Sequence, residues 1–217
     1  MYKNIQRAAL ALMFGLLWTI NAHAFGIGGL ETGVDYAEIN PEVASSGDKV
    51  QVVELFWYGC PACYSAEPHV ENWLKNKPEN VEFVRIPAIF NNPRWALHAQ
   101  AYYTAEALGV LDDFHAPFFH AIHRFRKPMS SAQEIREFFV QIGVKGEDFD
   151  QTFSSFMVET KVRRAADLTG RYKINGVPAL AVNGKYLVDG PMAKTYENMF
   201  KTVNILAEHE AERLAKR

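Results

Sequence analysis

Residues 50–64 constrain the fold of this chain more than any other stretch of its sequence. The stretch begins with a mostly apolar, β-branched and aromatic run, which is typical of a strand covered on both faces of a sheet. Pro61 follows, and proline suits the first turn of a helix, where its missing N–H is not needed. Cys60 is therefore predicted at a helix N-terminus, where unpaired N–H groups and the helix dipole stabilise a thiolate.

Cys60 and Cys63 are the only cysteines in the chain. A structural disulfide stabilises mainly by closing a long loop, and two intervening residues close almost none. A zinc site would need two further ligands, yet no second Cys-x-x-Cys or His-x-x-x-His motif follows; His69 and His98 are the residues that could be recruited. A redox-active dithiol is the favoured interpretation, and metal binding stays open as its alternative.

The first 24 residues have the three parts of a secretory signal peptide. Lys3 and Arg7 precede an apolar run over residues 8–20, and residues 22–24 form a small-x-small cleavage site. The run is shorter than the roughly 20 apolar residues of a transmembrane helix, and an uncleaved anchor is the alternative. We expect cleavage before Phe25 and export to an oxidising compartment, where a disulfide persists.

The mature chain, residues 25–217, has the length of a single domain with room for an insertion. Hydrophobic residues make up 48% of the sequence and the net charge is −2, which is ordinary for a globular protein. Proteins that bind nucleic acid usually carry a basic surface. The composition therefore argues against a nucleic-acid partner.

Secondary-structure signals divide the mature chain into three parts. Residues 81–86 alternate like a strand, so they form a β-α-β unit of parallel strands with residues 50–56 and the Cys60 helix. Residues 36–39 precede this unit as a predicted short edge strand. Residues 91–157 show helical spacing instead. The last part contains a connecting helix over residues 158–173, a hairpin with a type I′ turn at Asn183-Gly184, and a long helix over residues 192–216.

Four helices are predicted within residues 91–157. Gly109 ends the first, Asp112-Asp113 can cap the second, a capping box at Ser131 and Glu134 begins the third, and Gly146 begins the fourth. Aromatic residues at helical spacing are predicted to form the core of a helical bundle, and no cofactor is assigned to them. They include Phe114, Phe118, Phe119, Phe125, Phe138, Phe139, Phe149, Phe153 and Phe156. The histidines of this part (His115, His120 and His123) suggest a metal site, but packed or surface histidines are commoner than ligands.

Val177-Pro178 immediately precedes the first strand of the hairpin. Proline cannot donate to a β-ladder, so Pro178 belongs at a strand start, and its X-Pro bond is a candidate for the cis form. Together with the Cys-x-x-Cys motif and the order of elements, this segment resembles the DsbA family of periplasmic thiol:disulfide oxidoreductases. The resemblance covers essentially the whole mature chain. It implies an α/β, thioredoxin-like fold with an inserted all-helical domain.

The resemblance also implies domain boundaries and residue roles. Residues 25–87 and 158–217 would form the discontinuous thioredoxin-like domain, and residues 88–157 the helical insertion. Cys60 would contact substrates, with Cys63 as its buried partner. Glu54 would be the buried acid beneath the site and relay protons for Cys63; a satisfied structural carboxylate is the alternative. The predicted substrate-binding residues are Pro61, Ala62, Val177 and Pro178.

Position 62 departs from the pattern of the family. The familiar motif is Cys-Pro-His-Cys, whereas this chain has Ala62 in place of the histidine. A histidine there can stabilise the thiolate and alanine cannot. We expect a Cys60 pKa that is below that of a free thiol but higher than it would be with histidine, and a less oxidising couple.

The predicted activity is that of an oxidase that donates its Cys60–Cys63 disulfide to reduced exported proteins through a mixed disulfide, without a cofactor. The resemblance implies a periplasmic monomer that a membrane quinone-linked partner of the DsbB type reoxidises. A periplasmic reductase or isomerase is the nearest alternative. A metal-binding or chaperone module that uses the dithiol as a ligand pair is the alternative from outside the enzymes.

Overall fold

The computed structural model describes residues 26–45 and 47–216. Its central layer is a five-stranded sheet in the order β1-β5-β4-β2-β3. The strands are β1 (Ala37–Glu38), β2 (Val50–Phe56), β3 (Val81–Pro87), β4 (Ala179–Val182) and β5 (Tyr186–Asp189). The predicted signal peptide lies outside the described residues and stays a prediction. Of the helices within the described ranges, none combines the length and the apolar character that crossing a membrane requires.

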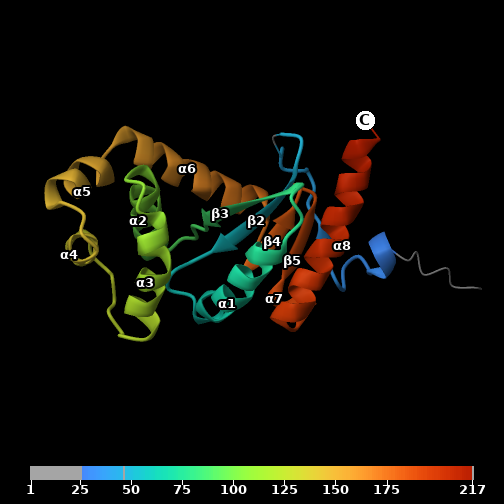
Figure 1. The fold of residues 1–217 in the computed structure, drawn as a ribbon, viewed down its shortest axis with the longest axis horizontal. Helices are drawn as coiled ribbons and strands as arrows, with labels where there is room; N and C mark the ends of the chain where they lie inside the picture. Colours follow the sequence, from blue (N-terminus) through green and yellow to red (C-terminus); the bar gives the residue numbers. More distant parts are fainter. Residues whose placement is uncertain (1–25, 46, 217) are drawn as a thin grey trace, which may run out of the picture.

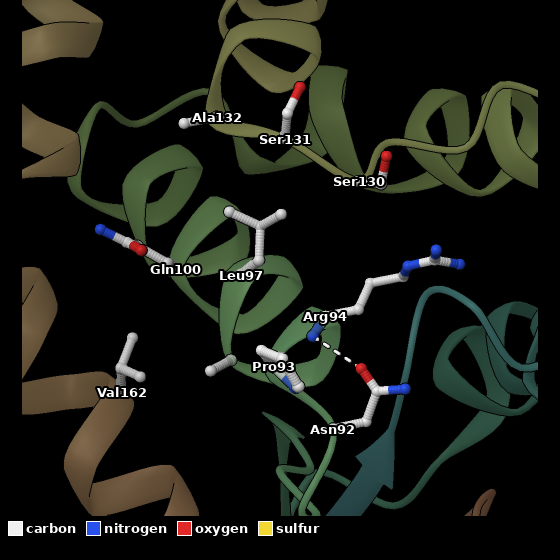
Figure 2. Close-up of a pocket in the computed structure, with 10 residues that line it drawn as sticks. Asn92, Pro93, Arg94, Leu97, Gln100, Ser130, Ser131, Ala132 and Val162 are labelled. Atoms are coloured by element: carbon white, nitrogen blue, oxygen red, sulfur yellow. Dashed lines mark hydrogen bonds between the residues drawn. The ribbon is translucent and has the colours of Figure 1, made fainter.

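Helices surround the sheet and extend beyond one end of it (Figure 1). They are the short 3₁₀ segment η1 (Ile27–Gly29) and the α-helices α1 (Pro61–Asn76), α2 (Pro93–Ala107), α3 (Leu111–His123), α4 (Ala132–Gln141), α5 (Gly146–Phe153), α6 (Phe156–Arg171), α7 (Gly190–Ala193) and α8 (Tyr196–Ala215). In Figure 1, helices α2–α5 gather at one end of the elongated molecule, and α6 runs from them back to the sheet.

Strand β2 lies inside the sheet and leads directly to the Cys-x-x-Cys motif. It pairs in parallel with β3, with Glu54 opposite Arg85, and this confirms the predicted β-α-β unit. On its other side β2 pairs antiparallel with β4, where Leu180 lies opposite Glu54. Every residue of β2 except Gln51 is buried, as expected of a strand covered on both faces.

The two faces of the sheet belong to different cores, because successive residues of a strand point to opposite faces. Val52 packs in a core with α1 and α8, in which Trp73 stacks on Phe200 with ring centroids 5.6 Å apart. Val53 points the other way, into a core that continues among helices α2–α6. Glu54 follows the parity of Val52, so its carboxylate lies on the α1 side of the sheet.

Aromatic residues fill the core of the helical part, as predicted. Phe114 stacks on Phe118 and on Phe139, with ring centroids 4.6 Å and 4.7 Å apart. The predicted capping box is present at the start of α4: Ser131 and Glu134 each accept the other's backbone N–H through their side chains. The sequence therefore predicted both the packing and one helix start of this part.

Three details predicted for the helical part are wrong. Asp112 and Asp113 do not cap α3; they lie in its first turn, where carboxylates favour the helix dipole, and the N-cap is Val110. Phe125 and Phe156 are not core residues, since their exposed fractions are 64% and 76%. Helix α3 ends before Phe125 and α6 begins at Phe156, so each ring projects from a helix end.

The hairpin of β4 and β5 turns at the predicted residues. Asn183 and Gly184 have positive φ angles of 51° and 68°, and the Lys185 N–H donates to the Val182 carbonyl at 3.0 Å. This geometry agrees with the predicted type I′ turn. Gly184 is required for a second reason, because a Cβ at this position would collide with the carbonyl oxygen of Val43.

The closing helix is in two pieces, which corrects the prediction of one helix from Met192 onward. Lys194 has a φ of 64° and interrupts the helical path after α7. The Thr195 side chain then accepts the N–H of Asn198 at 3.1 Å and caps α8. The interruption makes Tyr196 the first residue of α8.

Candidate functional site

The two cysteines lie where the sequence places them. Cys60 is the N-cap of α1 and Pro61 is its first residue. The Cys60 Sγ accepts the N–H of Cys63 at 3.3 Å. Cys63 is fully buried one turn into the helix, whereas Cys60 is partly exposed, and both are free thiols. The site is therefore a reduced dithiol with one accessible sulfur.

The two thiols differ in acidity. A hydrogen bond from the Cys63 thiol, aided by the N–H groups of Cys63 and Ala62, outweighs burial and lowers the pKa of Cys60 to about 6. Burial raises the pKa of Cys63 well above its ordinary value, and the interaction with Cys60 adds to this effect. At neutral pH Cys60 is mainly a thiolate and Cys63 a thiol. This combination suits exchange at the outer sulfur.

The Val177-Pro178 loop lies against Cys60. Its peptide bond is cis, as the sequence suggested. The Cys60 thiol donates to the Val177 carbonyl at 3.3 Å. Pro61 and Ala62 are exposed, Val177 is half-buried and Pro178 is buried. The residues predicted to bind substrate therefore border the reactive sulfur.

Glu54 is fully buried, and among the described residues Arg85 is the one cation it contacts, which two other carboxylates share. Its Oε2 accepts from Arg85 Nε at 3.0 Å, and its Oε1 has no partner. Arg85 also contacts Glu67 at 3.4 Å and Glu71 at 3.1 Å. Burial, despite Arg85 and reinforced by Glu67, raises the pKa of Glu54 to about 7. Its charge contributes in turn to the raised pKa of Cys63.

The polar cluster around Glu54 extends to Tyr58, two residues before Cys60. Tyr58 Oη and His115 Nδ1 are 2.7 Å apart, and His115 Nε2 lies 3.3 Å from Glu67 Oε2. Burial lowers the pKa of His115 to about 3, so the imidazole is neutral and one ring nitrogen carries the hydrogen. A chain of polar side chains thus connects Tyr58 to Glu54 through His115, Glu67 and Arg85.

Two of the histidines considered as metal ligands lie within hydrogen-bond distance of backbone carbonyl oxygens. His98 Nε2 lies 2.9 Å from the Met129 carbonyl, and His123 Nε2 lies 2.8 Å from the Tyr58 carbonyl. The His123 ring also stacks on Tyr64, with centroids 4.9 Å apart. Within residues 26–45 and 47–216, no three His, Cys, Asp or Glu side chains are grouped so as to hold a metal ion.

Several residues of the site were not predicted. Arg85 had a signal, because it is a charged residue opposite Glu54 in a strand predicted to run parallel to β2. Glu67 had a weaker one, since it lies one turn after the second cysteine on the same helix. Tyr196 had none: its phenol donates to the Ala62 carbonyl at 2.8 Å, a contact between segments far apart in the sequence.

The comparisons with known proteins agree with this geometry. Residues 51–201 match the family described as the DSBA-like thioredoxin domain. The chain is 36% identical over 203 residues to the thiol:disulfide interchange protein DsbA of Pseudomonas aeruginosa, across 93% of this chain and 92% of that protein. It is 37% identical over 182 residues to the same-named protein of Pseudomonas syringae pv. tomato, across 83% and 85% of the two chains.

Solved structures extend the likeness to three dimensions. The crystal structure of Pseudomonas aeruginosa DsbA matches with a TM-score of 0.79 and 39% identity, over 85% of this chain and 96% of that chain. The oxidoreductase DsbA from Xylella fastidiosa matches with a TM-score of 0.78 and 29% identity, over 84% and 98%. The predicted thioredoxin-like fold with inserted helices is confirmed.

Proposed function

Because the chain belongs to the DsbA-like thioredoxin family, we propose that it is a thiol:disulfide oxidoreductase that oxidises reduced exported proteins. The observation that carries this function is the asymmetry of its dithiol: the accessible Cys60 has a pKa of about 6, and the buried Cys63 has a raised pKa. A stabilised Cys60 thiolate favours the reduced form of the pair. The disulfide is therefore an oxidant.

The reaction transfers one disulfide in two steps. A thiolate of the client attacks the Cys60 sulfur; the Cys60–Cys63 bond breaks, and Cys63 leaves with the electron pair and takes up a proton. A second client thiolate then attacks the client sulfur of the mixed disulfide, and Cys60 leaves as a thiolate. The client loses two electrons and its thiol protons, and the protein dithiol gains the two electrons.

Glu54 is the proposed source of the proton for Cys63. A thiol with a raised pKa is a poor leaving group as an anion, so its departure requires a proton. Glu54 is buried and titrates near 7, so at neutral pH about half of the molecules carry a proton on it, and that proton is not held too tightly to release. Its electrostatic effect on Cys63 supports this assignment.

The Val177-Pro178 loop and the exposed start of α1 form the proposed client site. The Val177 carbonyl lies 3.3 Å from Cys60 Sγ and accepts its hydrogen when the thiol is protonated, and the Val177 backbone would pair with an extended client segment. Backbone pairing carries no sequence preference. Pro61 and Ala62 would contact the client beside the sulfur, where both are exposed.

The cellular setting is proposed from the sequence and the family. The predicted signal peptide over residues 1–24 would deliver the protein to the periplasm, where a membrane quinone-linked partner of the DsbB type would reoxidise it. We propose a monomer without a cofactor. Residues 25–87 and 158–217 would serve as the redox domain, and residues 88–157 as a helical domain that covers one end of it.

The strength of the oxidant depends on position 62. The Cys60 pKa of about 6 agrees with the prediction of a value below that of a free thiol. The second half of that prediction stays a prediction: Ala62→His is expected to lower the pKa further and make the couple more oxidising. Thiolate absorbance and equilibration with glutathione would measure both quantities, and unchanged values would contradict it.

The function is tested with oxidised protein and a reduced two-thiol peptide. We expect one peptide disulfide per protein disulfide, and a reduction potential against glutathione well above that of thioredoxin. Cys60→Ser and Cys63→Ser are matched controls, because each removes one sulfur and prevents the disulfide from forming. Peptide oxidation by Cys60→Ser would overturn the mechanism. A potential as low as that of thioredoxin would favour the alternative, a reductase.

A further inference from the structure

Tyr196 touches the active-site motif from the other end of the fold. Its phenol O–H donates to the carbonyl oxygen of Ala62 at 2.8 Å. That carbonyl and the N–H of Cys63 belong to the same peptide group. The N–H is the one that Cys60 Sγ accepts at 3.3 Å. The phenol, the peptide group and the sulfur therefore form one continuous chain of hydrogen bonds.

The fold holds Tyr196 in this place through the interruption between α7 and α8. Lys194, with its φ of 64°, ends the path of α7, and Thr195 caps α8 through the Asn198 N–H. Tyr196 is thereby the first residue of a long helix packed against α1 and the sheet. The His69 ring of α1 lies over the phenol ring, with centroids 5.0 Å apart. The donor is therefore fixed from both sides.

We propose that Tyr196 is a positioning residue that stabilises the Cys60 thiolate through the peptide group between Ala62 and Cys63. A carbonyl that accepts a hydrogen bond withdraws electrons from its own amide, so the N–H at the other end becomes a better donor. The effect is larger for the thiolate than for the thiol, because a charged acceptor gains more from each donor. This inference rests on the proposed function, since it concerns the redox poise of the same dithiol.

Two features of the site support this role. Burial and the charges of Cys63 and Cys60 raise the pKa of Tyr196, so its phenol keeps the proton that it donates when Cys60 ionises. Position 62 carries alanine, so no side chain at this position stabilises the thiolate. In this chain the Cys63 thiol and the N–H groups of Cys63 and Ala62 carry that task, and Tyr196 strengthens the Cys63 N–H.

The test is the variant Tyr196→Phe, which keeps the ring against His69 and removes only the donor. Cooperative strengthening amounts to about 10–30% of a charge-assisted hydrogen bond. We therefore expect the acid dissociation constant of Cys60 and the equilibrium constant for oxidation of glutathione each to fall by about 1.5- to 4-fold. Thiolate absorbance as a function of pH and equilibration with glutathione at pH 7 give the two values.

Tyr186→Phe is the matched control. Its phenol donates to Glu210 near the other end of α8, without a hydrogen bond to the Cys-x-x-Cys motif, so the same chemical change should leave both constants unaltered. A second variant carries 3-fluorotyrosine at position 196, a stronger donor, and should shift both constants in the opposite direction. A purely structural tether would not respond to donor strength with the opposite sign.

Unchanged constants in a folded Tyr196→Phe protein would overturn the inference, and so would a fluorotyrosine shift of the same sign as that of phenylalanine. If Tyr196→Phe does not fold, the fluorotyrosine protein decides alone. The proposed function fails separately, because its failure appears in the wild-type protein as an inability to oxidise the two-thiol peptide.

Discussion

Glu54 and Glu210 are both fully buried carboxylates, yet their surroundings differ in kind. The two oxygens of Glu210 accept from Lys185 at 2.6 Å, Asn183 at 2.7 Å, Arg213 at 3.2 Å and the Tyr186 phenol at 3.3 Å. Among residues 26–45 and 47–216, Glu54 has one donor, Arg85, and its other oxygen has no partner. Glu210 thus has several hydrogen-bond donors, whereas Glu54 shares the single cation Arg85 with other carboxylates.

The difference shows that the number of donors, and not burial, decides what a buried acid does. Burial alone raises the pKa of both groups. Hydrogen bonds from Lys185 and Asn183 reverse this for Glu210, whose pKa is lowered overall. Nothing reverses it for Glu54, whose pKa rises to about 7. Glu210 is thus a permanent anion that connects α8 to the hairpin, and Glu54 is a group that titrates.

The largest effect is expected on stability, from Glu210→Ala. The substitution leaves the buried ammonium of Lys185 and the amide of Asn183 without a partner, so the free energy of unfolding should fall by about 3–5 kcal/mol. Urea unfolding measures it. The glutathione equilibrium of the folded fraction should not change, because the dithiol lies elsewhere. A loss below about 1 kcal/mol would remove the structural role assigned to this carboxylate.

The complementary substitution, Glu54→Gln, should affect the reaction rather than the fold. The amide keeps the shape and an acceptor for Arg85 but cannot deliver a proton. We expect the rate of peptide oxidation at pH 7 to fall by about 100-fold or more. Stopped-flow fluorescence with a reduced two-thiol peptide measures the rate.

The control for Glu54→Gln is Glu82→Gln, an exposed glutamate of β3, which should keep the wild-type rate. A wild-type rate in Glu54→Gln would show that Glu54, like Glu210, has a structural role and does not supply the proton.

The pH dependence of stability should have opposite signs for the two acids. The pKa of Glu54 is raised from 4.5 to about 7, so between these values the folded state binds more protons than the unfolded state. The free energy of unfolding should therefore fall as pH rises from about 4.5 to 7, by up to about 2.5 kcal/mol. The pKa of Glu210 is lowered, so its contribution should be lost as pH falls below about 4.5.

Urea unfolding of the reduced protein at a series of pH values measures this dependence. Glu54→Gln should reduce the decline between pH 4.5 and 7 and leave the acid limb in place; the part that remains belongs to Glu67, whose pKa burial also raises to about 7. An undiminished decline in Glu54→Gln would place the titrating group elsewhere.

Local signals were enough to predict most of the fold. The strand before Cys60, the proline after it, the capping box at Ser131 and the turn at Asn183-Gly184 are each decided by residues within one turn or one strand. The start of the closing helix was missed because a threonine inside an amphipathic pattern does not reveal that it will cap a new helix. Thr195 became a cap only together with the positive φ of Lys194.

The site divides in the same way between local and tertiary information. Cys60, Cys63 and Val177-Pro178 follow from motifs, and Glu54 stands out as an acid inside a buried strand. The properties of Glu54 do not follow from its strand, because they depend on how many acids reach Arg85 from α1. The role of Glu210 had no signal in the sequence for the same reason: apart from Arg213, its donors come from a hairpin that the sequence alone does not place beside α8.

The smallest effect is expected from Glu71→Gln, which tests why the pKa of Glu54 is raised whereas that of Glu210 is lowered. Glu71 is the most exposed of the three acids on Arg85, with 54% of its side chain accessible. Glu71→Gln removes one negative charge from the cluster and frees Arg85 to serve Glu54 and Glu67. Both changes favour the ionised form of Glu54, so its pKa should fall, by about 0.2–0.5 units because solvent screens an exposed charge.

NMR titration of the glutamate carboxyl carbons measures this shift, with Glu82→Gln as the control that removes a charge without touching Arg85. A fall in the pKa of Glu54 in Glu71→Gln alone would show that competition for the cation keeps this acid titratable. An unchanged pKa would leave burial as the sufficient cause. Arg85 would then lower the pKa of Glu54 by less than Lys185 lowers the pKa of Glu210.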